Sequence, residues 1–250
     1  MTIMTQSIRW LEILLTIFIA LLTVIIVFQR KMLYYPSHRL ETNGLAAWTI
    51  GGRLIGYARN VDNPKNVWLF THGNAGQAAD RAYALQCFSD SDSVFILEYP
   101  GYGNRKGSPS KVSFNSAAEE AYRWLRKTYP NIPVCIVGES IGSGPASSLT
   151  GLEKPPDKLV LVVPFDNLAS VARGHFPPIP AGLVLFDRWD NVEAMKGYSG
   201  KLEIYGAIDD RVIPIHHAKT LAKSLPIAVF HEIPGGHNDW SQSGMVKIRN

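Results

Sequence analysis

Serine, histidine and aspartate occur where the chain leaves short apolar segments, and these residue types together can perform nucleophilic catalysis. Ser140 stands in the pattern Gly138-x-Ser140-x-Gly142, directly after the apolar run at 134–137. This is the pattern of a nucleophile elbow, in which a serine sits on a sharp strand-to-helix turn above a sheet. A side chain at either glycine would crowd the turn or the neighbouring strand. The sequence therefore predicts Ser140 as a nucleophile.

A serine nucleophile needs an imidazole to take its proton and a carboxylate to orient that imidazole. His237 lies in a glycine-rich loop just past the last apolar strand segment, so we expect it to be the base. The acid should follow a strand end between the serine and the histidine, where Asp209 and Asp210 are adjacent. Asp210 begins an Asp-x-hydrophobic-hydrophobic-Pro sequence and is the preferred acid. Asp209, which is better spaced from Gly206, is the alternative.

Acyl transfer also requires hydrogen-bond donors at the developing oxyanion. The backbone N–H of Ile141, directly after the serine, is the expected first donor. The second is expected from the loop at 72–76, with the backbone N–H of Asn74 as the preferred group. His72 in the same loop is expected to bond loop backbone, and an ordinary glycine-rich turn is the alternative interpretation of the loop.

Alternating strand and helix segments surround these residues, which predicts an α/β fold with a mostly parallel central sheet flanked by helices. An antiparallel hairpin at 48–57 is expected at its edge. Ser116 and Glu119 are expected to form a capping box in the helix at 113–129. The other strands are expected at 67–71, 94–99, 134–137, 159–163, 202–205 and 227–230, and the other helices at 77–88, 141–150 and 216–224.

Composition narrows the class of protein. The chain has 250 residues, of which 46% are hydrophobic, which suits one globular catalytic domain. Its formal net charge of +4 comes from scattered basic residues without a basic patch, so no nucleic-acid partner is expected. The two cysteines form no disulfide framework, and no Cys/His spacing suits zinc, so neither a metal nor a cofactor is expected.

A nearly uninterrupted apolar stretch at 10–28 predicts one N-terminal transmembrane helix. Arg30 and Lys31 close it, and Tyr34 and Tyr35 suit the membrane interface. Its length favours an uncleaved anchor over a cleaved signal peptide or a buried core helix. We expect residues 1–36 to be a membrane anchor with a juxtamembrane linker and residues 37–250 to be the catalytic domain. The positive charges that follow the apolar stretch favour a single-pass membrane protein whose catalytic domain is cytoplasmic.

Several segments of the sequence together resemble one group of enzymes. They are residues 33–36, 72–76, 99–103 with 107–110, 138–142, 164–168 and 236–239. With the order Ser140, Asp210, His237, they are similar to the membrane-anchored α/β-hydrolase-domain serine hydrolases that have a single N-terminal anchor. The elbow together with Pro145, and the Gly-His-Asn-Asp segment at 236–239, also resemble the corresponding segments of protein depalmitoylases of that superfamily. The resemblance implies the α/β-hydrolase fold with a small cap at 165–198.

Within that cap, Phe176, Leu183 and Phe186 are expected to line an acyl pocket, or else to pack the loop onto the sheet. The sequence thus predicts a membrane-anchored serine hydrolase that cleaves carboxylic ester or thioester bonds of a small-molecule or lipid substrate through an acyl-enzyme on Ser140. A protein depalmitoylase and a peptidase of the prolyl-oligopeptidase type are alternatives. A catalytically silent, membrane-tethered binding scaffold is the alternative from another class.

Overall fold

The computed structural model describes residues 2–177, 180–242 and 244–250, apart from the side chains of residues 2–6 and Leu183. Its strands are β1 (Ala46–Ile50), β2 (Arg53–Arg59), β3 (Val67–Thr71), β4 (Ser93–Leu97), β5 (Val134–Glu139), β6 (Lys158–Val162), β7 (Lys201–Ala207) and β8 (Ala228–Ile233). Its helices are α1 (Thr2–Leu33), η1 (Ala78–Cys87), α2 (Lys111–Thr128), η2 (Ser140–Gly142), α3 (Ser143–Ser148), η3 (Leu149–Gly151), α4 (Leu168–His175), α5 (Ala181–Val184), α6 (Asn191–Ala194) and α7 (His216–Ser224).

All eight strands form one sheet in the order β1-β2-β4-β3-β5-β6-β7-β8. The hairpin β1–β2 is antiparallel and pairs antiparallel with β4, whereas the strands from β4 to β8 are parallel. The predicted fold class is therefore confirmed. In the register of β3 and β5, Thr71 lies opposite Gly138, so the loop after β3 and the elbow after β5 leave the same edge of the sheet side by side.

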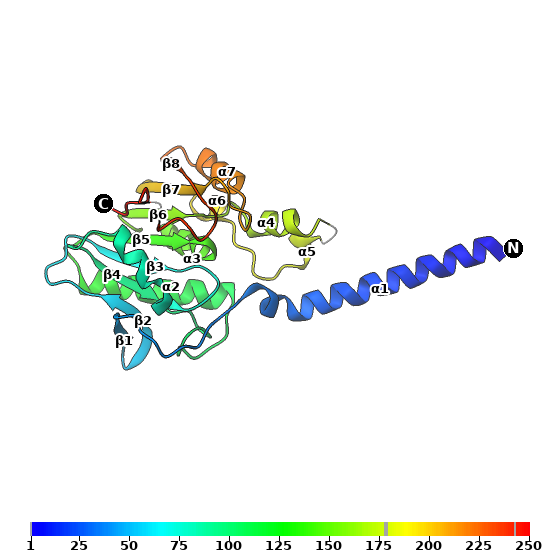
Figure 1. Ribbon diagram of the computed structural model, residues 1–250, viewed down its shortest axis with the longest axis horizontal. Coiled ribbons are helices and arrows are strands. Elements are labelled where there is room, and N and C mark those ends of the chain that lie inside the picture. The colour runs from blue at the N-terminus through cyan, green and yellow to red at the C-terminus, as the bar shows by residue number, and fades with distance from the viewer. Residues whose placement is uncertain (1, 178–179, 243) are drawn as a thin grey trace.

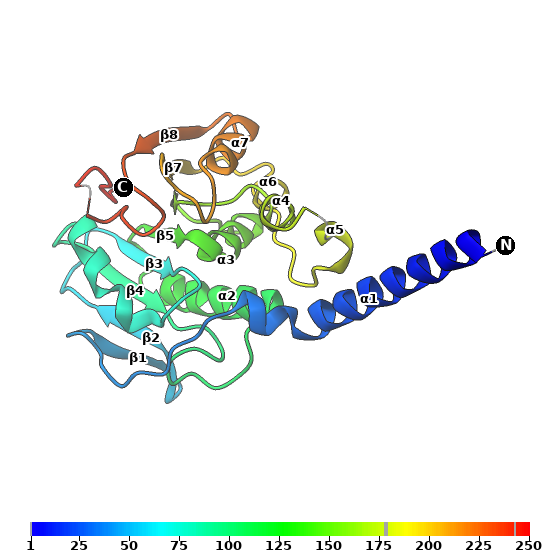
Figure 2. The same cartoon turned by 45° about the vertical axis from the view of Figure 1, so that its right-hand side comes forward.

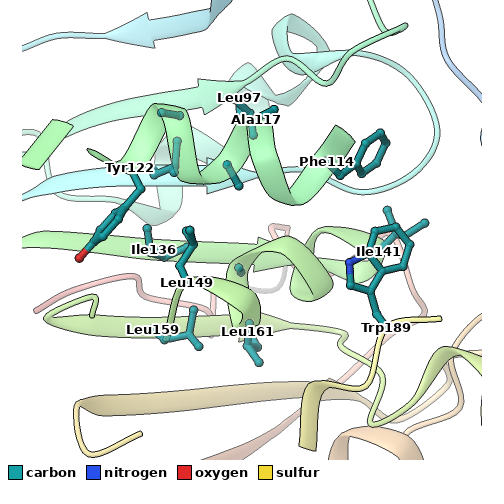
Figure 3. Packing of buried hydrophobic residues seen from close by; sticks show 14 of the residues in the cluster. Leu97, Phe114, Ala117, Tyr122, Ile136, Ile141, Leu149, Leu159, Leu161 and Trp189 are labelled. Atoms are coloured by element: carbon teal, nitrogen blue, oxygen red, sulfur yellow. The ribbon is translucent and has the colours of Figure 1, made fainter. Parts of the chain in front are cut away.

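Helices and loops bury both faces of this sheet. On one face α2, α3 and α7 pack on strand side chains such as Leu97, Ile136 and Leu161 (Figure 3). On the other face, η1 and the C-terminal segment pack on the alternate residues of the same strands, among them Phe70 and Val137. Successive residues of each strand thus enter opposite cores. This explains why the sequences of these strands are continuous apolar runs.

One local expectation was wrong. The capping box of α2 is formed by Ser110 and Ser113, not by Ser116 and Glu119, because the helix begins at Lys111 and Ser116 already lies inside it. The helix expected at 77–88 is present as the 3-10 helix η1. A 3-10 helix rises about 2.0 Å per residue against 1.5 Å in an α-helix, so this segment covers more of the sheet for its length.

The cap expected at 165–198 contains three short helices, α4, α5 and α6, between β6 and β7. The apolar helix α1 projects away from the body, and only its C-terminal end meets the body, beside α5 (Figure 1, Figure 2). Within α1, Ser7–Leu33 is long and apolar enough to cross a membrane, and the most apolar window of 18 residues in it is not covered by the rest of the chain.

Candidate active site

The turn after β5 has the geometry of a nucleophile elbow. Ser140 has a φ of +52°, a left-handed conformation that is costly for a residue with a side chain. A Cβ at Gly138 would lie 2.8 Å from the Cα of Ser143, and one at Gly142 would overlap the carbonyl oxygen of Thr71. The two glycines therefore allow the turn to pack against α3 and β3 while the serine side chain stands above the sheet.

Three predicted residues meet above this turn. The Nε2 atom of His237 lies 2.9 Å from the Oγ of Ser140, and its Nδ1 lies 2.7 Å from the Oδ2 of Asp210. The other carboxylate oxygen of Asp210 accepts the N–H groups of Val212 and Ile213, each at 2.8 Å. An acceptor at Nδ1 favours the tautomer with its proton there, so the Nε2 lone pair faces the serine hydroxyl. This geometry suits removal of the serine proton during attack on a carbonyl.

The two neighbouring aspartates are in different environments. The side chain of Asp210 is buried against His237, whereas Asp209 is exposed. The backbone N–H of Asp209 donates to the carbonyl of Gly235 at 3.0 Å, which links the acid loop to the loop that carries the histidine. Asp210 is thus the residue brought to the imidazole, and Asp209 contributes backbone to the same region.

Ile141 and Asn74, the expected oxyanion donors, line the same cleft as Ser140. Both side-chain groups of Asn74 are engaged, since its Nδ2 donates to the carbonyl of Leu33 and its Oδ1 accepts from Tyr102. Within the described residues, the backbone N–H of Asn74 has no hydrogen-bond acceptor. His72 bonds loop backbone as expected, with its Nδ1 2.7 Å from the carbonyl oxygen of Gly73.

Glu139, which sequence reasoning missed, connects the elements of the site. Its carboxylate accepts the N–H of Gly73 at 2.7 Å and the Nε of Arg81 at 2.9 Å. It also accepts the Tyr83 hydroxyl and the Trp240 indole N–H, each at 3.1 Å. Burial raises the pKa of Glu139, but Arg81 and the N–H of Gly73 outweigh burial and hold it at about 2. A charged residue directly before the nucleophile, at the end of a buried strand, was the available signal.

The cleft around Ser140 has a volume of about 400 Å³. Its apolar wall is formed by Leu33, Phe165, Leu168, Val171, Val212 and Ile213. Phe176 instead lines a neighbouring groove, and Phe186 is 60% exposed, so among the described side chains neither lines the cleft. The part of the wall that comes from the cap is formed by Phe165 and by the first turn of α4, whereas both Phe176 and Phe186 lie beyond the end of that helix. The side chain of Leu183 lies outside the described residues.

Known proteins share this fold, although no family model matches the chain. An esterase from Pyrococcus furiosus superposes with a TM-score of 0.61 at 14% identity, over 83% of this chain and 95% of its own. An uncharacterized protein of Mycobacterium tuberculosis is 29% identical over 230 residues, which cover 84% of this chain and 81% of that protein. These likenesses show that the chain has the α/β-hydrolase fold.

In sequence, the chain is similar to the lysophosphatidylserine lipase ABHD12. The Xenopus tropicalis protein is 34% identical over 194 residues, which cover 68% of this chain and 50% of the relative. The chain thus spans about half the length of the ABHD12 proteins that it matches.

Proposed function

We propose that this chain is a membrane-anchored serine hydrolase in which Ser140 is the nucleophile, His237 the general base and Asp210 the acid. Ser140 attacks the acyl carbonyl while His237 takes its proton, and Asp210 stabilises the imidazolium. His237 then protonates the leaving alcohol and activates the water that releases the acyl group. The continuous contact from Asp210 through His237 to Ser140, at 2.7 and 2.9 Å, carries the proposal.

The backbone N–H groups of Ile141 and Asn74 are proposed to hold the oxyanion. Ile141 directly follows the nucleophile, and Asn74 lies in the loop beside it. Such donors act mainly on the tetrahedral intermediates, and loss of one typically lowers kcat by about 10²–10³-fold.

A single-chain lipid ester suits the cleft best. Towards α1 the cleft adjoins an apolar groove of about 140 Å³, and Leu33 lines both. On the opposite side it adjoins a pocket of about 280 Å³ lined by Arg81, Tyr83, Asn238 and Gln242. An amphiphile would place its acyl chain along α4 and its headgroup at the polar end. The name of the ABHD12 relatives, lysophosphatidylserine lipase, agrees with this substrate class.

Residues 1–36 are proposed to be the anchor and juxtamembrane linker, and residues 37–250 the catalytic domain. The exposed apolar surface of α1 supports insertion into a bilayer. Arg30 and Lys31 at its C-terminal end favour a cytoplasmic catalytic domain. In this arrangement the apolar groove between α1 and α4 lies near the membrane interface, where an acyl chain could enter it directly.

A substrate panel tests the proposal in the full-length protein in detergent micelles. Lysophosphatidylserine, lysophosphatidylcholine, a monoacylglycerol, an acyl thioester and short-chain p-nitrophenyl esters are compared. We expect the long-chain lysolipids and monoacylglycerol to have the highest kcat/KM, and all hydrolysis to be lost in Ser140→Ala. Higher activity on the thioester would favour a depalmitoylase instead, and equal kcat/KM at all chain lengths would contradict the lipid assignment.

Two variants on α4 sharpen this test. Ala172 lines the apolar groove, so Ala172→Trp should lower activity on long acyl chains and spare the short esters. A Cβ built at Gly174, on the same helix, would have no atom within 4 Å. Gly174→Trp is therefore the matched control and should change the activity on neither the long-chain nor the short-chain esters.

A further inference from the structure

The segment that joins α1 to the body runs directly beside the loop that carries Asn74. Pro36 and Gly76 form a parallel β-bridge. The N–H of Ser37 donates to the carbonyl of Gly76 at 2.8 Å, and the N–H of Gly76 donates to the carbonyl of Tyr35 at 3.2 Å. The juxtamembrane segment, residues 33–37, is therefore hydrogen-bonded to the loop at 72–76 as a short extra strand.

The side chain of Asn74 makes two more bonds to this segment and one to Tyr102. Its Nδ2 donates to the carbonyl of Leu33, the last residue of α1. Its Oδ1 accepts the N–H of Tyr35 at 3.3 Å and the hydroxyl of Tyr102 at 2.9 Å. These bonds fix the Asn74 side chain between the end of α1 and a tyrosine, which leaves only its backbone N–H available to the cleft.

Tyr102 and the end of α1, between which the Asn74 side chain lies, are themselves fixed by other contacts. Tyr102 is fully buried, and its ring packs against His72 and Phe114. The end of α1 is tied to the cap, because Arg30 and the hydroxyl of Tyr34 both contact the Asp187 carboxylate, at 2.9 and 3.0 Å. Gln29 also bonds the backbone of Val184 and Phe186.

We propose that the juxtamembrane segment positions the oxyanion donor, with the Asn74 side chain and Tyr102 as positioning residues. The loop contains Gly73 and Gly76, the latter at a φ of +96°, so its backbone has unusual conformational freedom. An oxyanion donor is effective only when it is oriented before the reaction. The end of the membrane helix thus fixes the direction of the Asn74 N–H. This inference rests on the proposed function.

The test compares Asn74→Ala, Tyr102→Phe and the double variant in the full-length protein. Asn74→Ala keeps the backbone N–H but removes all three side-chain bonds, and should lower kcat by about 10–100-fold with KM changed less than about twofold. Tyr102→Phe keeps the packed ring and should lower kcat by about fivefold. Because both act through one contact, the double variant should be no slower than Asn74→Ala.

Tyr122→Phe is the matched control. Tyr122 is also buried, and its hydroxyl donates to the carbonyl of Lys154 at 2.9 Å and accepts the Nε–H of Arg126 at 2.7 Å, remote from the cleft. Both Tyr→Phe variants should lower the thermal midpoint by roughly 2–4 °C, but only Tyr102→Phe should lower kcat. If Asn74→Ala and Tyr102→Phe match the wild-type kcat while Ser140→Ala is inactive, the positioning role is wrong. Wild-type hydrolysis that persists in Ser140→Ala would overturn the proposed function and this inference together.

Discussion

At the scale of single residues, the site depends on which of two adjacent aspartates faces the imidazole. Sequence context favoured Asp210 over Asp209, and in the structure the carboxylate of Asp210 lies 2.7 Å from the Nδ1 of His237. Spacing alone could not decide this, because the choice depends on how the loop after β7 turns. The bonds from Val212 and Ile213 to the other oxygen of Asp210 set that turn.

The two aspartates should respond differently to removal of charge. We expect Asp210→Asn to lower kcat by roughly 10³–10⁴-fold, because an amide favours the wrong imidazole tautomer. The kcat of Asp209→Asn should stay within about twofold of the wild-type value, because Asp209 contributes only its backbone N–H, which the variant keeps. Initial rates on one ester, with both variants at equal folded concentration, measure the difference. A larger loss in Asp209→Asn would reverse the assignment of the acid.

At the scale of elements, the strand-turn-helix unit around the nucleophile was predictable because its pattern is local. Continuous apolar strands, two glycines and a serine suffice to specify the elbow. The position of Phe176 in the groove beside α1, and not in the cleft, was not predictable, because the path of the cap depends on contacts with distant elements. Asn191, for example, bonds the hydroxyl of Ser143 in α3 at 2.9 Å.

Gly142 should be essential for the elbow, whereas Gly151 should be replaceable. A Cβ at Gly142 would overlap the Thr71 carbonyl, so Gly142→Ala must displace β3 or the elbow. We expect a loss of about 1–3 kcal/mol in the free energy of unfolding, with reduced kcat. A Cβ at Gly151 would have no atom within 4 Å. Gly151→Ala should therefore leave kcat and the free energy of unfolding unchanged, or raise the latter slightly. Urea unfolding and ester hydrolysis of both variants measure this, and equal behaviour would contradict the packing described for the elbow.

At the scale of the whole molecule, contacts between segments far apart in sequence complete the site. The Arg30–Asp187 pair joins residues 157 positions apart, and Glu139 joins the loops that carry Gly73 and Trp240. The sequence predicted an anchor and a hydrolase body but not their hydrogen-bonded connection, because such contacts leave no periodic pattern. The end of α1 and the cleft around Ser140 are therefore adjacent parts of one structure.

Stability at acid pH should depend on Glu139. Its pKa of about 2 lies below the unfolded value, so its contribution is complete above about pH 4.5 and is lost as the pH falls towards 2. The size of the shift corresponds to roughly 3 kcal/mol. Glu139→Gln should therefore unfold more easily at pH 7 and show a shallower loss of stability between pH 5 and 2.

Exposed Glu119, paired with Arg123 at 2.7 Å, provides the control for that experiment. Glu119→Gln should change the free energy of unfolding by less than about 0.5 kcal/mol. Urea unfolding across the pH range measures both variants. An unchanged acid slope in Glu139→Gln would show that Glu139 is not held in its charged form.

The central claim, that Ser140 is an activated nucleophile, is tested most directly by mapping a fluorophosphonate adduct by mass spectrometry. We expect the full-length protein to gain one adduct, located on the peptide containing Ser140, and His237→Ala to form it much more slowly. Ser140→Ala should gain none. An adduct on another residue, or equal labelling of the wild type and Ser140→Ala, would show that Ser140 is not the nucleophile.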